Sequence, residues 1–325
     1  MTTFSKINSP CAWKREEISS DSDWQISLTE THIKEINNLV SGNSKETPSL
    51  TKLLSGAGEL LENGPGVVLI RDCPIQDLNE HEAKKLFLSI ASQVGTLVSQ
   101  SSEGELIFSV KDSGYKDNDP RSRGPNTRKK LSFHSDRCDV IGFLCLKQAL
   151  SGGENQIVSS AAIHNYLLNN EPELIELLYQ PFYYKRHNVD TGNELPYCRQ
   201  PIFSVTEEKF ACNLLRVLID RAYDMPELPN MSEEQKRALD AIEEIASLPD
   251  MHFSFRQSPG DILFLNNWIT LHRRSEFVDF PEPEQKRHIL RAWISPPNNR
   301  AIDPLFEDNY GDYRAGRVRG GMRPE

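Results

Sequence analysis

Two histidines and one aspartate form the pattern with the most chemical meaning in this chain. His134 and Asp136 are separated by one residue, and His272 lies far downstream. Two imidazoles and one carboxylate can occupy one face of an octahedral metal ion and leave the opposite face open, as in non-haem Fe(II) sites. On an extended strand, His134 and Asp136 would face one way while Ser135 points away. The sequence therefore predicts a metal centre formed by His134, Asp136 and His272.

Two arginines follow the second histidine and extend this pattern. Arg287 and Arg291 are four residues apart on a predicted strand, so both side chains should project to the same face. A guanidinium group binds a carboxylate through two parallel hydrogen bonds. If that face looks toward the metal, the two arginines would suit a dicarboxylate cosubstrate and an acidic group of a substrate.

Taken singly, these residues have more ordinary explanations. A His-x-Asp pair is more often a surface or hydrogen-bonded pair than a metal site, and a lone histidine on an apolar stretch is more often part of the core. Two arginines on a strand more often form a solvated face. The order and combination of the five side chains favour the metal centre over these alternatives.

Several short motifs carry a resemblance to a known family. They are Phe133-His134-Ser135-Asp136, Gly152-Gly153-Glu154, Ser258-Pro259-Gly260-Asp261, Asn266-Asn267 ahead of His272, Lys286-Arg287-His288-Ile289-Leu290-Arg291 and the tail Arg317-Val318-Arg319-Gly320-Gly321. As an ordered set they resemble the taurine dioxygenase (TauD/TfdA) family of Fe(II)- and 2-oxoglutarate-dependent oxygenases, which are built on a double-stranded β-helix. The similarity runs from about Gly66 to Gly321.

The resemblance implies a role for each matching side chain. His134, Asp136 and His272 would bind iron. Arg287 matches the arginine that anchors the distal carboxylate of 2-oxoglutarate, and Arg291 matches the arginine that faces anionic substrates in some members. Because Asp136 is present, the resemblance does not favour the related halogenases, which lack this ligand so that chloride can bind.

Three further positions have weaker signals. The family often places Thr or Ser shortly after the Gly-Gly pair to help hold the cosubstrate carboxylate, but here the residue is Asn155. Its amide can still donate a hydrogen bond, and Ser159 or Ser160 could serve instead. Gln100 either lines the pocket or is a plain amide at a strand end. Arg137 either meets an acidic substrate or forms a surface ion pair.

The resemblance also implies the reaction. Fe(II), 2-oxoglutarate and O2 would hydroxylate an unactivated C–H bond of a small, carboxylate-bearing metabolite, with release of succinate and CO2. Desaturation and ring closure begin with the same hydrogen abstraction and stay open as alternatives. A Zn(II) hydrolase could use the same three ligands, but it has no need of Arg287. A jelly roll that only binds a ligand is the third alternative, and the intact ligand set argues against it.

The helices and strands predicted from the sequence indicate an α+β, mainly β fold. We expect a double-stranded β-helix (jelly roll) core with flanking and inserted helices, in one domain over 1–325. Residues 1–62 should form a helical region that packs on this core, and the polar, basic stretch 112–130 should be an active-site lid. Helices are predicted over 30–42 (capped by Ser27), 53–61, 83–94, 210–223 and 232–247. Strands are predicted over 66–70, 97–100 paired with 106–110, 143–149, 156–160, 252–256, 262–265 and 288–294.

Composition excludes several classes of protein. The chain has 325 residues, a net charge of -10 and 38% hydrophobic residues, which argues against a general nucleic-acid surface and against disorder. Its six cysteines include no C-x-x-C pair, which indicates free thiols in a reducing compartment. No apolar run is long enough for a membrane span, and the first residues have no signal-peptide pattern. We therefore expect a cytoplasmic enzyme with a small-molecule substrate, and the sequence leaves a homo-oligomer open.

Overall fold

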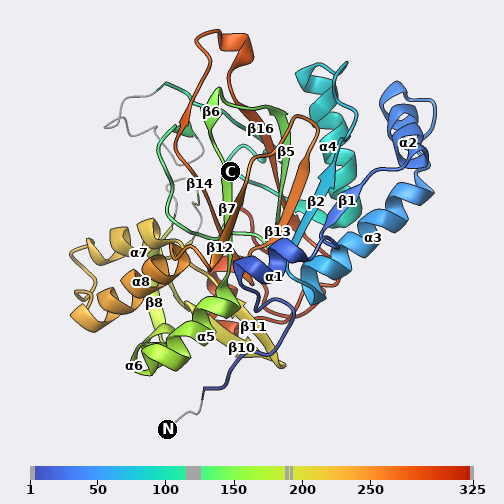
Figure 1. The fold of residues 1–325 in the computed structure, drawn as a ribbon. Helices are drawn as coiled ribbons and strands as arrows, with labels where there is room; N and C mark the ends of the chain where they lie inside the picture. The colour runs from blue at the N-terminus through green and yellow to red at the C-terminus, as the bar shows by residue number, and fades with distance from the viewer. Residues whose placement is uncertain (1–3, 115–125, 187–189, 191–192, 323–325) are drawn as a thin grey trace.

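The computed structural model describes residues 4–114, 126–186, 190 and 193–322, and these form a mixed α and β fold (Figure 1). In this described part of the chain, seven strands make a large sheet with the order β1-β2-β13-β5-β16-β3, and β4 also pairs with β16. The strands are β1 Gln25–Ser27, β2 Val67–Arg71, β13 Ile262–Asn266, β5 Val140–Lys147, β16 His288–Ser295, β3 Thr96–Val98 and β4 Ile107–Val110. Apart from the parallel pair β1 and β2, neighbouring strands are antiparallel.

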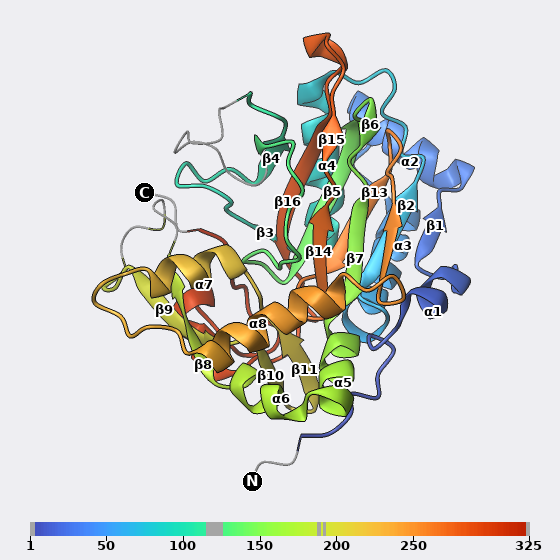
Figure 2. The same cartoon turned by 60° about the vertical axis from the view of Figure 1, so that its left-hand side comes forward.

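A smaller sheet lies across from the large one (Figure 2). Among the described residues it contains three antiparallel strands in the order β12-β7-β14, which are His252–Phe255, Asn155–Ser159 and Thr270–Arg274. Ile157 and Phe253 of this sheet pack with Ile141, Leu263 and Trp293 of the large sheet in one buried cluster. Alternate residues of each strand therefore supply the core between the sheets, as the two-residue period of a strand requires.

Helices α2 Glu30–Ser41, α3 Pro48–Asn63 and α4 Glu80–Val94 cover the outer face of the large sheet (Figure 1). Ile36, Leu54 and Phe87 from these helices pack against Val68 and Phe264 of the sheet. Because β2 is buried on both faces, its sequence is continuously apolar rather than alternating.

A second group of helices and short hairpins surrounds the other end of the molecule (Figure 2). These elements are α1 Arg15–Ser20, α5 Ser160–Asn170, α6 Pro172–Leu178, α7 Arg216–Tyr223, α8 Glu233–Ala246, α9 Glu307–Tyr310, and the pairs β8 Pro181–Lys185 with β9 Tyr197–Pro201 and β10 Phe203–Thr206 with β11 Lys209–Cys212. The pair β6 Ser151–Gly152 and β15 Phe277–Val278 closes the opposite end. The expectation of a mainly β fold is thus only partly borne out, because helices form a large share of the core.

The local predictions succeed where one periodic pattern decides the element. Helix α8 begins after Ser232, whose side chain and Gln235 form the expected capping box. Helix α2 has its N-cap at Thr29, two residues after the predicted cap, because Ser27 ends strand β1 and the Thr29 side chain accepts from the His32 N–H instead.

Two longer-range predictions are wrong. The segment 210–223 is not one helix, because its first residues complete β11 beside β10 and only Arg216–Tyr223 is helical. Strands β3 and β4 do not pair with each other across their turn. Both pair with successive parts of β16, which brings Gln100 beside Arg291 in the middle of that strand.

The predicted lid, residues 112–130, is described only at its two ends. Residues 115–125 of the predicted lid lie outside the described residues, so the lid stays a prediction. Its two ends are held together by the ion pair between Asp112 and Arg128, whose Oδ2 and Nε atoms lie 3.1 Å apart.

Across the described ranges, none of the helices has both the length and the apolarity that crossing a membrane requires.

A buried carboxylate joins the C-terminal tail to the sheets. Asp139 Oδ1 accepts from Trp268 Nε1 at 2.6 Å and Arg319 Nε at 2.7 Å, and its Oδ2 accepts from Ser295 Oγ and Asn299 Nδ2, each at 2.8 Å. Because Asp139 and Arg319 are both buried, each group leaves the other uncompensated when it is removed.

We expect Asp139→Asn to lower the free energy of unfolding by about 3 to 5 kcal/mol, the typical cost of breaking a buried ion pair. Urea denaturation would measure it. Asp312→Asn is the matched control, because it breaks the pair with Arg314, which lies on the surface, and it should leave the unfolding free energy nearly unchanged. Equal effects of the two variants would contradict the role given to Asp139.

Candidate metal centre and its surroundings

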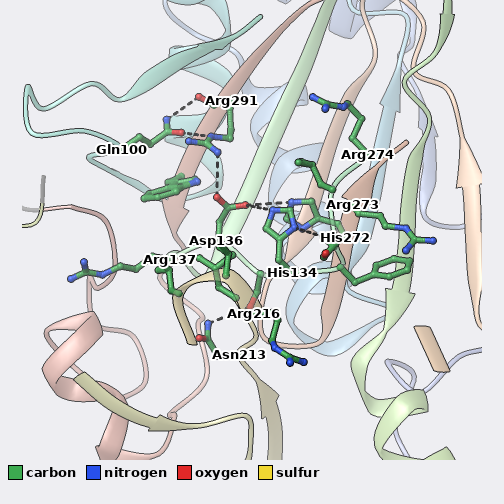
Figure 3. Close-up of a pocket in the computed structure, with 18 of the residues that line it drawn as sticks. Gln100, His134, Asp136, Arg137, Asn213, Arg216, His272, Arg273, Arg274 and Arg291 are labelled. Carbon is green, nitrogen blue, oxygen red and sulfur yellow. Dashed lines mark hydrogen bonds and ion pairs between the residues drawn. The ribbon is translucent and has the colours of Figure 1, made fainter. Parts of the chain in front are cut away.

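The fold brings the three predicted ligands together. Single donor atoms of His134, Asp136 and His272 all lie within 4.8 Å of one another. Asp136 Oδ2 lies 3.7 Å from Nε2 of His134 and 3.3 Å from Nε2 of His272 (Figure 3). Two imidazole nitrogens and one carboxylate oxygen therefore converge on one point, as a facial metal site needs.

Backbone pairing across the two segments places the histidines. His134 and His272 stand opposite each other and exchange two backbone hydrogen bonds, of 3.0 and 2.9 Å. His272 belongs to β14, whereas His134 makes only this isolated bridge, so the expected strand around Asp136 is not formed. Asp136 is held instead by its N–H, which donates to Asn267 Oδ1 at 3.1 Å. Ser135 does point away, because its Oγ accepts from the Leu214 N–H at 2.9 Å.

The surroundings prepare these side chains to act as ligands at neutral pH. Burial, helped by the neighbouring His272, lowers the pKa of His134 to about 4, so its imidazole is neutral. The Nδ1 of His134 lies 2.9 Å from the Ser132 carbonyl oxygen and would donate to it, which leaves the Nε2 lone pair facing Asp136. Burial alone would raise the pKa of Asp136, but Arg291 and the two histidines outweigh it and hold the pKa below its usual value. A carboxylate and neutral imidazoles are the donor set that binds a divalent transition metal.

A buried cation that forms no ion pair with the described residues lines the same cavity. Arg287 is 5% exposed, its Nε has no hydrogen-bond partner, and no carboxylate among the described residues forms an ion pair with it. Its guanidinium carbon lies 5.3 Å from the centre of the Phe277 ring. Burial lowers the pKa of Arg287 to about 10, so the group is still charged at neutral pH. Because an unpaired buried charge is costly, this arrangement indicates a binding site for an anion.

Arg291 contacts the second carboxylate oxygen of Asp136 and is held by Gln100. Arg291 Nη1 is 3.2 Å from Asp136 Oδ1, and its Nε donates to Gln100 Oε1 at 2.7 Å. Gln100 Nε2 donates in turn to the carbonyl oxygens of Arg291 and Leu106, each at 2.9 Å. Of the two readings of Gln100, the one in which it lines the pocket therefore fits this geometry.

Arg137, the third weak candidate, is already paired. Its Nη1 lies 2.5 Å from Asp190 Oδ2, and its Nε donates to the Asn309 carbonyl oxygen at 2.8 Å. Together with the metal centre, Arg287 and Arg291, it lines a cavity of about 910 Å³. The predicted alternative was a surface ion pair; an ion pair is present, but its partner Asp190 is buried and Arg137 lines the cavity.

Sequence and structure comparisons agree with this geometry. Residues 41–293 match the sequence model of the family described as taurine catabolism dioxygenase TauD, TfdA family. The chain belongs to the TauD/TfdA family. It is 31% identical to FR-33289 synthase of Streptomyces rubellomurinus, over 89% of this chain and 90% of that protein. It is 28% identical to the taurine hydroxylase-like protein SAT17 of Stachybotrys chartarum, over 93% of this chain and 85% of that protein.

A solved structure shares the fold. Asparagine oxygenase, in complex with Fe(II), 2S,3S-3-hydroxyasparagine and succinate, superposes with a TM-score of 0.66 and 15% sequence identity, over 91% of this chain and all of that one. The membership predicted from the ordered motifs is thus confirmed, and this TauD/TfdA protein is an Fe(II)- and 2-oxoglutarate-dependent dioxygenase.

The TauD/TfdA family often has a cosubstrate-binding Thr or Ser shortly after the Gly-Gly pair, and Asn155 stands at that position here. Asn155 lines the cavity, and its Nδ2 donates to Gln257 Oε1 at 3.1 Å. Ser159 is used elsewhere, because its Oγ caps helix α5 by accepting from the Ala162 N–H at 2.9 Å. Ser160 is fully buried and does not line the cavity. Of the three, Asn155 is the one whose position suits contact with a cosubstrate.

Two residues of the cavity wall were missed by the sequence analysis. Gln257 follows β12 and donates from Nε2 to the carbonyl oxygens of Phe143 and Asp261, each at 3.1 Å, so it orients Asn155. Arg274 lies two residues after His272 on β14 and also lines the cavity. The two-residue period of a strand could have found Arg274 once His272 was placed, whereas no local pattern marks Gln257.

Proposed function

We propose that His134, Asp136 and His272 hold Fe(II), that Arg287 anchors 2-oxoglutarate, and that the enzyme hydroxylates a C–H bond of a small, carboxylate-bearing molecule. When bound, iron would activate O2, the oxidant, and 2-oxoglutarate would supply two electrons as it is decarboxylated to succinate and CO2. The observation that carries the proposal is the buried Arg287 guanidinium, which shares one cavity with the three ligands and forms no ion pair with a carboxylate of the described residues.

Each part of the site has a distinct task in this proposal. The three ligands occupy one side of the metal and leave the other side to the reactants. Arg287 fixes the far end of the cosubstrate, so that its keto-acid end is presented to the metal in one orientation. Phe108, Phe143 and Ile289 also line the cavity and help to exclude water.

The charge of the cavity supports an anionic substrate. Its lining includes many cationic side chains, which are Lys130, Arg137, Lys185, Arg186, Arg216, Arg221, Arg273, Arg274, Arg287 and Arg291. The acidic lining residues are Asp136, a proposed ligand, and Asp220, which pairs with Arg216. Arg137, Arg186, Arg216 and Arg273 pair with Asp190, Asp308, Asp220 and Glu243, and the positive charge that remains attracts anions.

Arg291 is the best candidate for the substrate carboxylate. Its Nε and Nη1 are engaged by Gln100 and Asp136, but its Nη2 forms no hydrogen bond with the described residues. That nitrogen can bind a substrate carboxylate beside the metal. Gln100 would then act by orienting Arg291, and Arg137 would contact an acidic group through its remaining N–H donors, because its Nη1 is paired with Asp190. Asparagine oxygenase, which was crystallised with a hydroxylated amino acid, supports a substrate of this size and class.

Three further features belong to the proposal. We infer that the large and small sheets form the two halves of a double-stranded β-helix and that residues 1–325 form one domain. The buried cluster that joins Ile36 and Leu54 to Phe264 supports this unity. All six cysteines, each within the described ranges, are buried free thiols, which supports a reducing, cytoplasmic location.

Anaerobic titration of Fe(II) into the apo-protein with 2-oxoglutarate tests the assignment. We expect a visible metal-to-ligand charge-transfer band, followed on exposure to air by succinate formation. Small acids should stimulate succinate formation more than their matched amides if Arg291 binds a carboxylate. Iron binding without the band would refute the cosubstrate assignment, and failure to bind iron would refute the metal assignment.

A further inference from the structure

A second buried arginine accompanies Arg287 at the same end of the cavity. Arg274 is 6% exposed and lies on the same face of β14 as His272, two residues away. The guanidinium carbons of Arg274 and Arg287 lie 4.7 and 5.3 Å from the centre of one ring, that of Phe277. Two positive charges therefore share one aromatic side chain.

Arg274, like Arg287, forms no ion pair within the described part of the chain, although the carboxylates of Asp112 and Asp279 lie near enough to favour its charged form. Its Nε donates to the Ser275 carbonyl oxygen at 3.3 Å and its Nη2 to the Lys129 carbonyl oxygen at 2.6 Å, and both acceptors are uncharged. Its Nη1 forms no hydrogen bond with the described residues. The neighbouring Arg273, which points to the other face of the strand, is paired with Glu243 at 2.8 Å. The protein thus neutralises Arg273 but leaves Arg274 and Arg287 with positive charge to spare.

Arg274 lies across from residue 155, near which other family members often have a Thr or Ser hydroxyl. In the pairing of β7 with β14, Arg274 stands directly opposite Asn155. Side chains of directly opposite residues lie on the same face of a sheet, here the face toward the cavity. The Asn155 amide gives one of its two N–H groups to Gln257, and the Arg274 guanidinium opposite it can supply a further, charged donor toward an anion at this point.

We propose that the distal carboxylate of 2-oxoglutarate lies between Arg287 and Arg274, and that Arg274 replaces the Thr or Ser hydroxyl that other family members place near residue 155. This inference rests on the proposed function. In the absence of the anion, two buried guanidinium groups repel each other beside Phe277. A carboxylate between them removes that repulsion and accepts hydrogen bonds from both, so it is favoured over an uncharged tail.

The test compares two cosubstrates that differ only at the distal end. 2-Oxopentanoate has a methyl group where 2-oxoglutarate has its distal carboxylate, and both present the same keto-acid group to the metal. Dissociation constants would be measured anaerobically from the charge-transfer band of the Fe(II) protein. We expect Arg274→Gln to weaken 2-oxoglutarate binding roughly 10- to 30-fold, and to change 2-oxopentanoate binding by less than about twofold.

Arg216→Gln is the matched control, because it also removes a positive charge from the cavity, and Figure 3 shows Arg216 on the opposite side of the metal centre from Arg274. It should leave both dissociation constants close to the wild-type values. Arg274→Lys, which keeps the charge, is a second variant should Arg274→Gln fail to fold, and its loss should also be confined to 2-oxoglutarate.

The outcomes separate the inference from the proposed function. An equal loss for both ligands would show that Arg274 acts only through its bonds to residues 129 and 275, and would overturn the inference. Unchanged 2-oxoglutarate binding in Arg274→Gln would also overturn it. By contrast, a wild-type protein that gives no band with 2-oxoglutarate would remove the proposed function itself.

Discussion

Asp136→Ala and His272→Ala should each abolish measurable Fe(II) binding and all turnover of 2-oxoglutarate. Each variant removes one of three donor atoms that lie within 4.8 Å of one another. Loss of a group that only orients a metal ligand typically costs about 10- to 100-fold in affinity, and loss of a ligand itself should cost more. Anaerobic equilibrium dialysis with Fe(II) would measure the affinity, and succinate formation would measure turnover.

His252→Ala is the matched control for the histidine variant. His252 is also partly buried, and its Nδ1 contacts the Leu248 carbonyl oxygen rather than a second imidazole or a carboxylate. This variant should bind iron as the wild type does. Full iron affinity in Asp136→Ala or His272→Ala, with the fold intact by circular dichroism, would refute the assignment of the metal ligands.

The convergence of the three proposed ligands could be predicted from the sequence, because the residue types and the short motifs around them are recognisable even though the residues lie far apart in the chain. His134 and Asp136 are recognisable by spacing, and His272, Arg287 and Arg291 by the motifs around them. Their convergence depends on the bridge between His134 and His272, which is a pairing of distant segments. Such pairing leaves no periodic signal in either segment. The same reason explains why β3 and β4 were expected to pair with each other when both in fact pair with β16.

The support of the site was less predictable than its ligands. Asp136 was expected on a strand, but its loop is held by Asn267 and by the Leu214 segment, which reaches Ser135. Gln257 and Arg274 were not identified, because their importance comes from what stands opposite them rather than from their own neighbours in sequence. The role proposed for Arg274 can be inferred only once the pairing register of β7 and β14 is known.

Arg287→Met should weaken 2-oxoglutarate binding on the order of 100-fold and leave Fe(II) binding in the absence of 2-oxoglutarate close to the wild-type value. A bidentate pair between a guanidinium and a carboxylate in a buried site contributes several kcal/mol, and each 1.4 kcal/mol corresponds to a factor of ten. The charge-transfer titration measures the first quantity and equilibrium dialysis the second. Methionine has a similar length and apolar character, so it can occupy the space without the charge.

Arg291→Met is the comparison, since it removes a buried arginine four residues along the same segment. It should affect the prime substrate more than 2-oxoglutarate, because Arg291 contacts Asp136 and Gln100 rather than the Phe277 end of the cavity. A similar loss of 2-oxoglutarate affinity in both variants would contradict the division of tasks between the two arginines.

The same Arg287→Met variant should be more stable than the wild type in the absence of ligands. Arg287 is buried and forms no ion pair with the described residues, and the nearby Asp279 accepts from its backbone N–H rather than from its guanidinium. Removal of the charge therefore relieves a cost that a bound anion would offset. We expect the free energy of unfolding in urea to rise by about 1 to 2 kcal/mol, the opposite sign from Asp139→Asn. With Fe(II) and 2-oxoglutarate at concentrations that saturate the wild type, the order should reverse, because a roughly 100-fold weaker 2-oxoglutarate affinity removes up to about 2.7 kcal/mol of ligand stabilisation from the variant. An Arg287→Met protein that is less stable than the wild type under both conditions would mean that Arg287 supports the fold rather than an anion site.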